Sequence, residues 1–252
     1  PARKLVTGRS GMVALVVPQS SDLQQSGLFI EGVAGLSAQF SSRGMQFVLH
    51  VTGTDEPIVN VYQRLIGNGM LDGFVLFSPR DNDPRATFLR EQGIPFVVHG
   101  RIWPQADHAF FDIDNEGIFH QITSHLIGHG HNRIAFINGG LGHGFASARM
   151  RGYERALAGA GLALDPALVR HGEMTEARGL VTTVEMFRID GLRPTAVVCS
   201  DVRIAKGVYT ALEALGLSIP GDVSVIAHDD HLPQLRASAF FPALSVTKAP
   251  LR

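Results

Sequence analysis

Short apolar runs alternate along this chain with longer stretches in which apolar residues recur every three or four positions. Most of the short runs are apolar almost throughout, which is typical of strands buried on both faces of a sheet. We expect strands at Met12–Val17, Gln46–Val51, Gly73–Phe77, Phe96–His99, Arg133–Ile137, Ala196–Cys199 and Val223–Ala227. The pattern therefore predicts parallel sheets.

The longer stretches have the period of helices with one buried face. The clearest apolar stripes begin at Phe29, Ile118 and Ile204. Glycines such as Gly44 and Gly216 follow helical stretches, where a left-handed cap is expected. Because strand–helix–strand repeats with short turns form right-handed crossovers, the predicted fold class is α/β.

The chain is long enough for two such sheets, because 252 residues exceed the usual size of one domain. We expect two doubly wound parallel-sheet lobes. Residues 1–11 are predicted to be a linker remnant, and residues 12–102 and 244–252 to form an N-terminal lobe without its last elements. Residues 103–243 are predicted to form a C-terminal lobe.

Composition narrows the function classes. The net charge is -1, and no predicted helix carries a stripe of lysine or arginine, so this chain is not expected to grip a phosphate backbone by itself. The only cysteine, Cys199, lies in an apolar run, which is compatible with a reducing cytosol. No apolar run reaches the length of a membrane span, and no signal-peptide pattern opens the chain. We expect a cytoplasmic protein without membrane contact.

A glycine-rich run at Gly139–Gly144 follows a predicted strand and precedes a helix, where backbone amides could hold a phosphate. A dinucleotide site also needs an acidic residue at the end of the next strand, roughly 20 residues later. That distance falls within Glu154–Gly161, which has helical period. We therefore favour a flexible crevice loop over a cofactor site.

The sequence contains no convincing motif for metal binding or for catalysis. A group of histidines has no cysteine nearby and suits helix capping better than zinc binding: His120, His125, His129 and His131. The chain has no G-x-S-x-G elbow, and Asp229 and Asp230 are neighbours whose side chains point apart on an extended strand. We expect no cofactor, no metal and no enzymatic activity.

Polar residues at strand ends point instead to ligand binding. Asp201 and Asp229 follow two predicted strands, and the carboxyl ends of parallel strands form the crevice where small ligands bind. Asp201 also begins a helix, so it is expected to act as an N-cap. Arg149, at the start of the helix after the glycine-rich run, could form a bidentate fork to a hydroxylated or anionic ligand.

Motifs along the chain resemble the lactose repressor (LacI) family of bacterial transcription regulators. The main ones are R-M-R-G-Y at Arg149–Tyr153, TAVVCSDVRIAKG at Thr195–Gly207, LSIPGDVSVIAHDD at Leu217–Asp230 and PALSV at Pro242–Val246. Shorter matches lie at Leu71–Gly73, Asp114–Gly117 and Gly128–Phe136. Together they appear in family order and span the chain from Met12 onward.

The resemblance implies a core like that of periplasmic sugar-binding proteins, with an effector in the cleft between two lobes. It also implies a homodimer and binding to operator DNA through an N-terminal helix-turn-helix domain that is absent from this chain. A periplasmic or secreted sugar-binding protein would share this fold, and the sequence preceding residue 1 would distinguish the two. A Rossmann-type enzyme is a second alternative, which a nucleotide-binding assay would reveal.

By the same resemblance, the effector contacts are expected at Gln25, His99, Asp112, Arg149, Met174, Ser200, Asp201 and Asp229. Arg149 matches the family's ligand-clamping arginine, and Asp229 matches the aspartate that binds effector hydroxyls. Ser200 stands where asparagine is usual. Gln25 and Met174 stand where aromatic residues are common. Carboxylates, amide, imidazole and guanidinium suit several neutral hydroxyls, so we expect a mono- or disaccharide. The general pattern resembles regulators of α-glucoside uptake.

Overall fold

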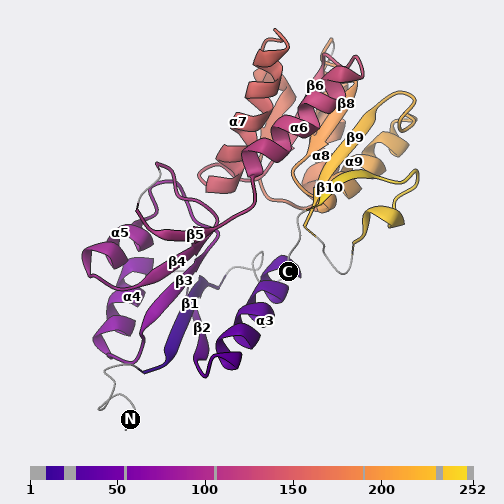
Figure 1. Cartoon of the computed structure of the whole chain (residues 1–252). Coiled ribbons are helices and arrows are strands. Elements are labelled where there is room, and N and C mark those ends of the chain that lie inside the picture. The colour runs from indigo at the N-terminus through magenta and orange to yellow at the C-terminus, as the bar shows by residue number, and fades with distance from the viewer. Residues whose placement is uncertain are drawn as a thin grey trace. The chain divides into compact units, whose positions relative to one another are not determined.

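The computed structural model describes residues 10–19, 27–53, 56–104, 107–189, 191–230 and 235–248 (Figure 1). The chain divides into two compact units, Pro1–Asp112 and Ile113–Arg252. Each unit contains one five-stranded sheet, and every strand pair in both sheets is parallel. The predicted α/β class with two doubly wound sheets is confirmed.

The first unit has the strand order β2-β1-β3-β4-β5. Its elements are β1 (Met12–Pro18), α3 (Gly27–Ser42), β2 (Gln46–Thr52), α4 (Ile58–Gly67), β3 (Gly73–Phe77), α5 (Pro84–Glu91), β4 (Phe96–His99) and β5 (Ala109–Phe111). Because side chains alternate along a strand, Ala14 and Val16 of β1 pack with α4 and α5, whereas Leu15 and Val17 pack with Phe29 of α3. Helices therefore cover both faces of this sheet (Figure 1).

The second unit has the strand order β10-β9-β8-β6-β7. Its elements are α6 (Asn115–Gly128), β6 (Ile134–Asn138), α7 (Gly144–Gly159), β7 (Val169–His171), α8 (Glu176–Arg188), β8 (Ala196–Cys199), α9 (Val202–Ala214), β9 (Ser224–Asp229) and β10 (Ser245–Lys248). Phe119 of α6 and Tyr153 of α7 pack on Phe136 and Val198 on one face of the sheet. In Figure 1, α8 and α9 lie on the other face.

All seven predicted strands are present, but three further strands escaped the sequence pattern: β5, β7 and β10. They are only three or four residues long and none of their residues is fully buried, so no long apolar run reveals them. Two expected boundaries change as a result. Residues 109–111 pair with β4, so the first unit extends to residue 112 instead of 102, and residues 245–248 pair with β9 instead of joining the first unit. Of the predicted linker remnant at residues 1–11, residues 1–9 lie outside the described residues.

Glycines let the helices of the second unit pack backbone against backbone. A Cβ atom on Gly207 of α9 would lie 1.9 Å from the Glu176 carbonyl oxygen, and one on Gly179 of α8 would lie 2.1 Å from the Ile204 carbonyl oxygen. These distances are far shorter than any van der Waals contact. Glycine at these positions therefore sets how closely α8 and α9 approach.

The Gly207→Ala substitution is expected to lower the free energy of unfolding of the second unit by about 1–3 kcal/mol, because the helices must separate to admit the methyl group. Urea unfolding followed by circular dichroism measures this. Gly159→Ala is the matched control, since no atom lies within 4 Å of a Cβ placed on that helical glycine. Equal stability of the two variants would contradict this packing role.

His131 joins two strands at their amino ends. Its Nδ1 lies 2.9 Å from Thr195 Oγ1, just before β8, and its Nε2 lies 3.1 Å from Ser224 Oγ at the start of β9. Burial lowers the pKa of His131, and the nearby His129 lowers it further. The neutral ring, with one donor and one acceptor nitrogen, suits two hydroxyl partners. His129 itself is the C-cap residue of α6, as expected for a capping histidine.

This arrangement predicts a pH-dependent stability. The unfolded histidine titrates near pH 6.5, above the folded-state pKa, so as the pH is lowered the unfolded chain binds the proton first and stability falls. The contribution of His131 should be complete above about pH 6.5 and disappear as the pH falls through the lower folded-state pKa. The difference in unfolding free energy between about pH 7.5 and pH 5.5 should shrink in His131→Gln. An unchanged difference would refute the assignment.

Candidate functional site

Buried polar residues gather where the strands of the second sheet end. Asn138 ends β6, Ser200 and Asp201 follow β8, and Asp229 ends β9. Arg149 reaches the same edge from α7 and is 4 % exposed. The carboxyl ends of parallel strands meet at one edge, and polar groups are buried there only with partners. This carboxyl-end cluster is the candidate site.

Arg149 is held by several partners. Its Nε donates to Asn115 Oδ1 at 2.8 Å, and its Nη1 donates to the carbonyl and hydroxyl oxygens of Ser200 at 2.7 and 2.8 Å. The guanidinium carbon also lies 4.9 Å from the ring centre of Phe119 and 5.0 Å from that of Phe145. Hydrogen bonds and rings together fix the orientation of a cation that would be costly to bury alone.

Asp201 is a helix cap, as the sequence predicted. One carboxylate oxygen accepts from the Ile204 backbone N–H at 3.0 Å, and the other accepts from Arg203 Nε at 2.6 Å. Burial raises the pKa of Asp201, and the contacts with Arg203 and Ile204 reduce this effect without reversing it. Ser200, a second predicted effector contact, uses its hydroxyl to hold Arg149.

The end of β9 carries two aspartates with different surroundings. Asp229 is buried and 4 % exposed. Asp230 Oδ1 lies 3.3 Å from Nε2 of the buried His228, whose Nδ1 lies 3.0 Å from Thr247 Oγ1. Burial acts to raise the pKa of Asp230, but the contact with His228 and the positive charge of Arg149 outweigh it, so this pKa is lowered. The negative charge of Asp230 therefore partly balances the positive charge of Arg149, a role that the sequence did not reveal.

The first unit has its own polar and aromatic residues at strand ends. His99 ends β4, and its ring centre lies 4.6 Å from that of Phe77 and 4.8 Å from that of Phe111. The Asp112 side chain is largely buried, and its Oδ2 lies 3.8 Å from Arg101 Nε. Phe111 is 47 % exposed, and its position in a short edge strand hid it from the sequence analysis.

The two remaining predicted effector contacts are Met174 and Gln25. Met174 is half-buried in the turn between β7 and α8. Gln25 lies outside the described residues. Four of the predicted contacts lie at the carboxyl-end edge of the second sheet: Arg149, Ser200, Asp201 and Asp229.

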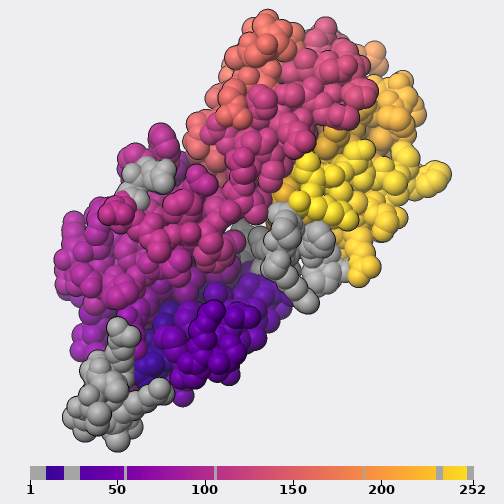
Figure 2. Space-filling view, viewed as in Figure 1, coloured from indigo at the N-terminus to yellow at the C-terminus, as the bar shows by residue number. Residues whose placement is uncertain are grey.

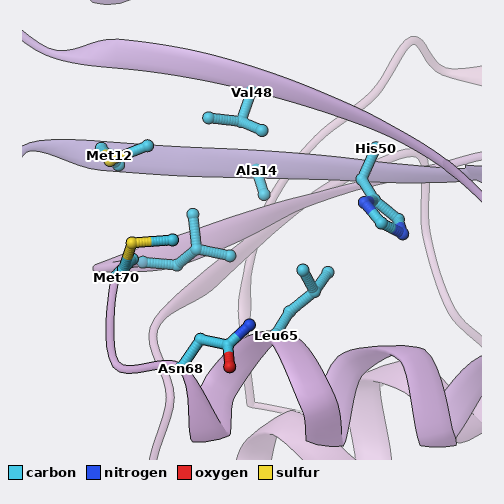
Figure 3. A pocket seen from close by; sticks show the side chains of 8 residues that line it. Met12, Ala14, Val48, His50, Leu65, Asn68 and Met70 are labelled. Atoms are coloured by element: carbon cyan, nitrogen blue, oxygen red, sulfur yellow. The ribbon is translucent and has the colours of Figure 1, made fainter.

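The glycine-rich run and a small cavity in the first unit are the other places where a ligand site could be sought. A Cβ atom on Gly139 would lie 2.6 Å from the Phe145 ring, so the glycine-rich run is explained by packing at this position. A cavity of about 80 Å³ lies beside α4 and the amino ends of strands in the first unit (Figure 3), well below the size of ligand pockets, about 300–1,000 Å³. It is lined by Met12, Ala14, Val48, His50, Leu65, Asn68, Met70 and Leu71. Within the described ranges, no His, Cys, Asp or Glu group is placed to hold a metal ion, and no helix could cross a membrane.

Comparison with known proteins decides the family. The family described as periplasmic binding proteins and sugar binding domain of LacI family matches residues 10–249. The HTH-type transcriptional regulator AglR of Rhizobium meliloti (strain 1021) is 39 % identical over 252 residues, covering 100 % of this chain and 70 % of the relative. The chain belongs to the LacI family. The resemblance inferred from sequence motifs is therefore confirmed.

Relatives and solved LacI-family structures agree. The HTH-type transcriptional regulator CelR of Thermobifida fusca is 33 % identical over 234 residues, covering 91 % of this chain and 68 % of the relative. A LacI-family regulatory protein from Chloroflexus aggregans has a TM-score of 0.84 at 30 % identity, covering 96 % of this chain and 85 % of that one. A complex of the regulator CelR with cellobiose has a TM-score of 0.83 at 30 % identity, covering 96 % and 73 %. These relatives are transcriptional regulators, so the alternative of a transport protein is not favoured.

Proposed function

We propose that this chain is the effector-binding part of a LacI-type regulator, and that a sugar binds at the carboxyl-end cluster. The observation that carries the proposal is Arg149, a cation held in a fixed orientation among buried polar residues at a sheet edge. A LacI-family structure of 30 % identity contains cellobiose, which supports the same ligand class for this chain.

The side chains suit neutral hydroxyl groups. The carboxylates of Asp201 and Asp229 accept hydrogen bonds and Arg149 donates them, a combination that binds a polyol without needing a charged ligand. In the first unit, His99 and Asp112 stay predicted effector contacts. Catalysis is not part of the proposal.

The proposed mechanism is a shift between two arrangements of the lobes. An effector changes their balance only through its differential affinity for the two. We infer that it changes operator affinity in this way, in the cytoplasm, through a helix-turn-helix domain like that of the relatives.

A homodimer is part of the proposal, because operator half-sites are usually read by two-fold symmetric pairs. The surface that we propose for it is the outer side of α3 and the edge strand β2, where Ile30, Leu49 and Val51 are 54 %, 40 % and 47 % exposed. Figure 2 shows α3 at the surface of the first unit. Sedimentation at micromolar concentration should show a dimer. A monomer would contradict the proposal that this surface holds two copies of the chain together.

Calorimetry against a panel of sugars tests the function. The panel should contain monosaccharides and disaccharides, α-glucosides among them, with purine nucleosides as the control class. We expect saturable binding of at least one sugar and a rise in the thermal midpoint with its concentration, since a ligand of the native state stabilises it. Binding of a purine with no response to any sugar would refute the ligand class.

A further inference from the structure

Asn138 is a fully buried side chain at the end of β6 with a partner for each side of its amide. Its Oδ1 accepts from the Gly139 backbone N–H at 2.8 Å and from the Ser200 hydroxyl at 3.2 Å. Its Nδ2 donates to the Ala146 carbonyl oxygen at 2.9 Å. One residue therefore joins the first turn of α7 to the end of β8.

These partners allow only one orientation of the amide. The backbone N–H of Gly139 can only donate and the carbonyl of Ala146 can only accept, so a flipped Asn138 would face a donor with its NH₂ group and an acceptor with its oxygen. The oxygen of Asn138 thus always faces Ser200.

The orientation of Asn138 determines the hydrogen bond that reaches Arg149. The Ser200 hydroxyl has a single proton, which it donates to Asn138 Oδ1. Its lone pairs then accept from Arg149 Nη1 at 2.8 Å. Without the asparagine oxygen, this hydroxyl could rotate, and one of the partners that fix Arg149 would lose its direction.

We propose that Asn138 is a positioning residue of the effector site, which acts through Ser200 to fix the guanidinium of Arg149 for sugar binding. The proposal rests on the proposed function of the carboxyl-end cluster. It assigns Ser200 to the support of Arg149 and makes the asparagine at the end of β6 a determinant of affinity that touches no ligand.

A double-mutant cycle separates positioning from stability. Asn138→Ala should weaken binding of the sugar found by the panel about tenfold when Arg149 is present, and by less than about twofold in an Arg149→Met background. Ser200→Ala should show the same dependence on Arg149, and it tests the proposal if Asn138→Ala does not fold. Asn132→Ala, an exposed asparagine before β6, is the matched control and should bind like wild type. Equal losses in both backgrounds, or full affinity in Ser200→Ala, would overturn the proposal.

A second readout does not depend on sugar binding. The ¹⁵Nε–H resonance of Arg149 reports the environment of its guanidinium. It should shift or broaden in Asn138→Ala and Ser200→Ala and stay in place in Asn132→Ala. An unchanged resonance in both site variants would refute the positioning role. A shifted resonance in a protein that binds no sugar would support the role of Asn138 and refute the ligand class.

Discussion

The Arg149→Met variant is expected to bind its sugar about 100-fold more weakly than the wild-type chain. Hydrogen bonds to charged groups contribute about 1.5–3 kcal/mol each, and about 1.4 kcal/mol corresponds to a factor of ten in affinity. Methionine retains an unbranched apolar stem between Phe119 and Phe145 but removes every donor. It also leaves Asn115 Oδ1 and the Ser200 carbonyl without the cation that they bind.

Calorimetry with Arg151→Met as the control isolates this effect. Arg151 lies on the same helix, but its side chain is 40 % exposed and pairs with Glu116. Arg149→Lys keeps the charge and loses the planar fork, so it should bind nearly as weakly as Arg149→Met. Circular dichroism must show that each variant is folded. Wild-type affinity in a folded Arg149→Met would remove Arg149 from the site.

The Asp83→Asn variant is expected to lose about 3 kcal/mol of unfolding free energy in the first unit, because it leaves the largely buried Arg85 guanidinium, 12 % exposed, without its counter-charge. Asp83 is 2 % exposed and lies 2.6 Å from Arg85 Nη2, which also donates to the Phe77 carbonyl at 3.2 Å. Burial acts to raise the pKa of Asp83, but the contacts with Arg85 outweigh it, so this pKa is lowered. The pair holds the segment that follows β3.

Urea unfolding followed by tryptophan fluorescence measures this loss, because Trp103 is the single tryptophan and belongs to the first unit. Glu91→Ala, on the same helix and exposed, should change the midpoint little. If Asp83→Asn and Glu91→Ala unfold at the same urea concentration, the charge of Arg85 must be balanced by another residue.

The fold was predictable because its central strands are largely apolar. In β6 and β8 every residue is buried, and these runs are visible in the sequence without knowledge of their neighbours. The edge strands could not be found in this way. Ser245–Lys248 has an exposed residue at each end and two half-buried residues between them, and only its pairing with β9 makes it a strand.

The site was predictable only in part. Asp201 was recognisable because it lies two residues after a predicted strand and caps the helix that follows. Asn138 was not, because its partner Ser200 is 62 residues away, and only the register of β6 beside β8 brings the two together. Gly139 was ambiguous by itself, since a glycine next to an aromatic ring and a glycine at a phosphate look alike in sequence, and only the missing acidic partner argued against a cofactor site.

The central claim is that a sugar binds at the carboxyl-end cluster of the second sheet. A crystal structure of the chain with the sugar found by the panel tests it most directly. We expect sugar hydroxyl oxygens about 3 Å from the Asp229 carboxylate and the Arg149 guanidinium. A sugar bound away from both residues, with Arg149 keeping only its protein partners, would contradict the account.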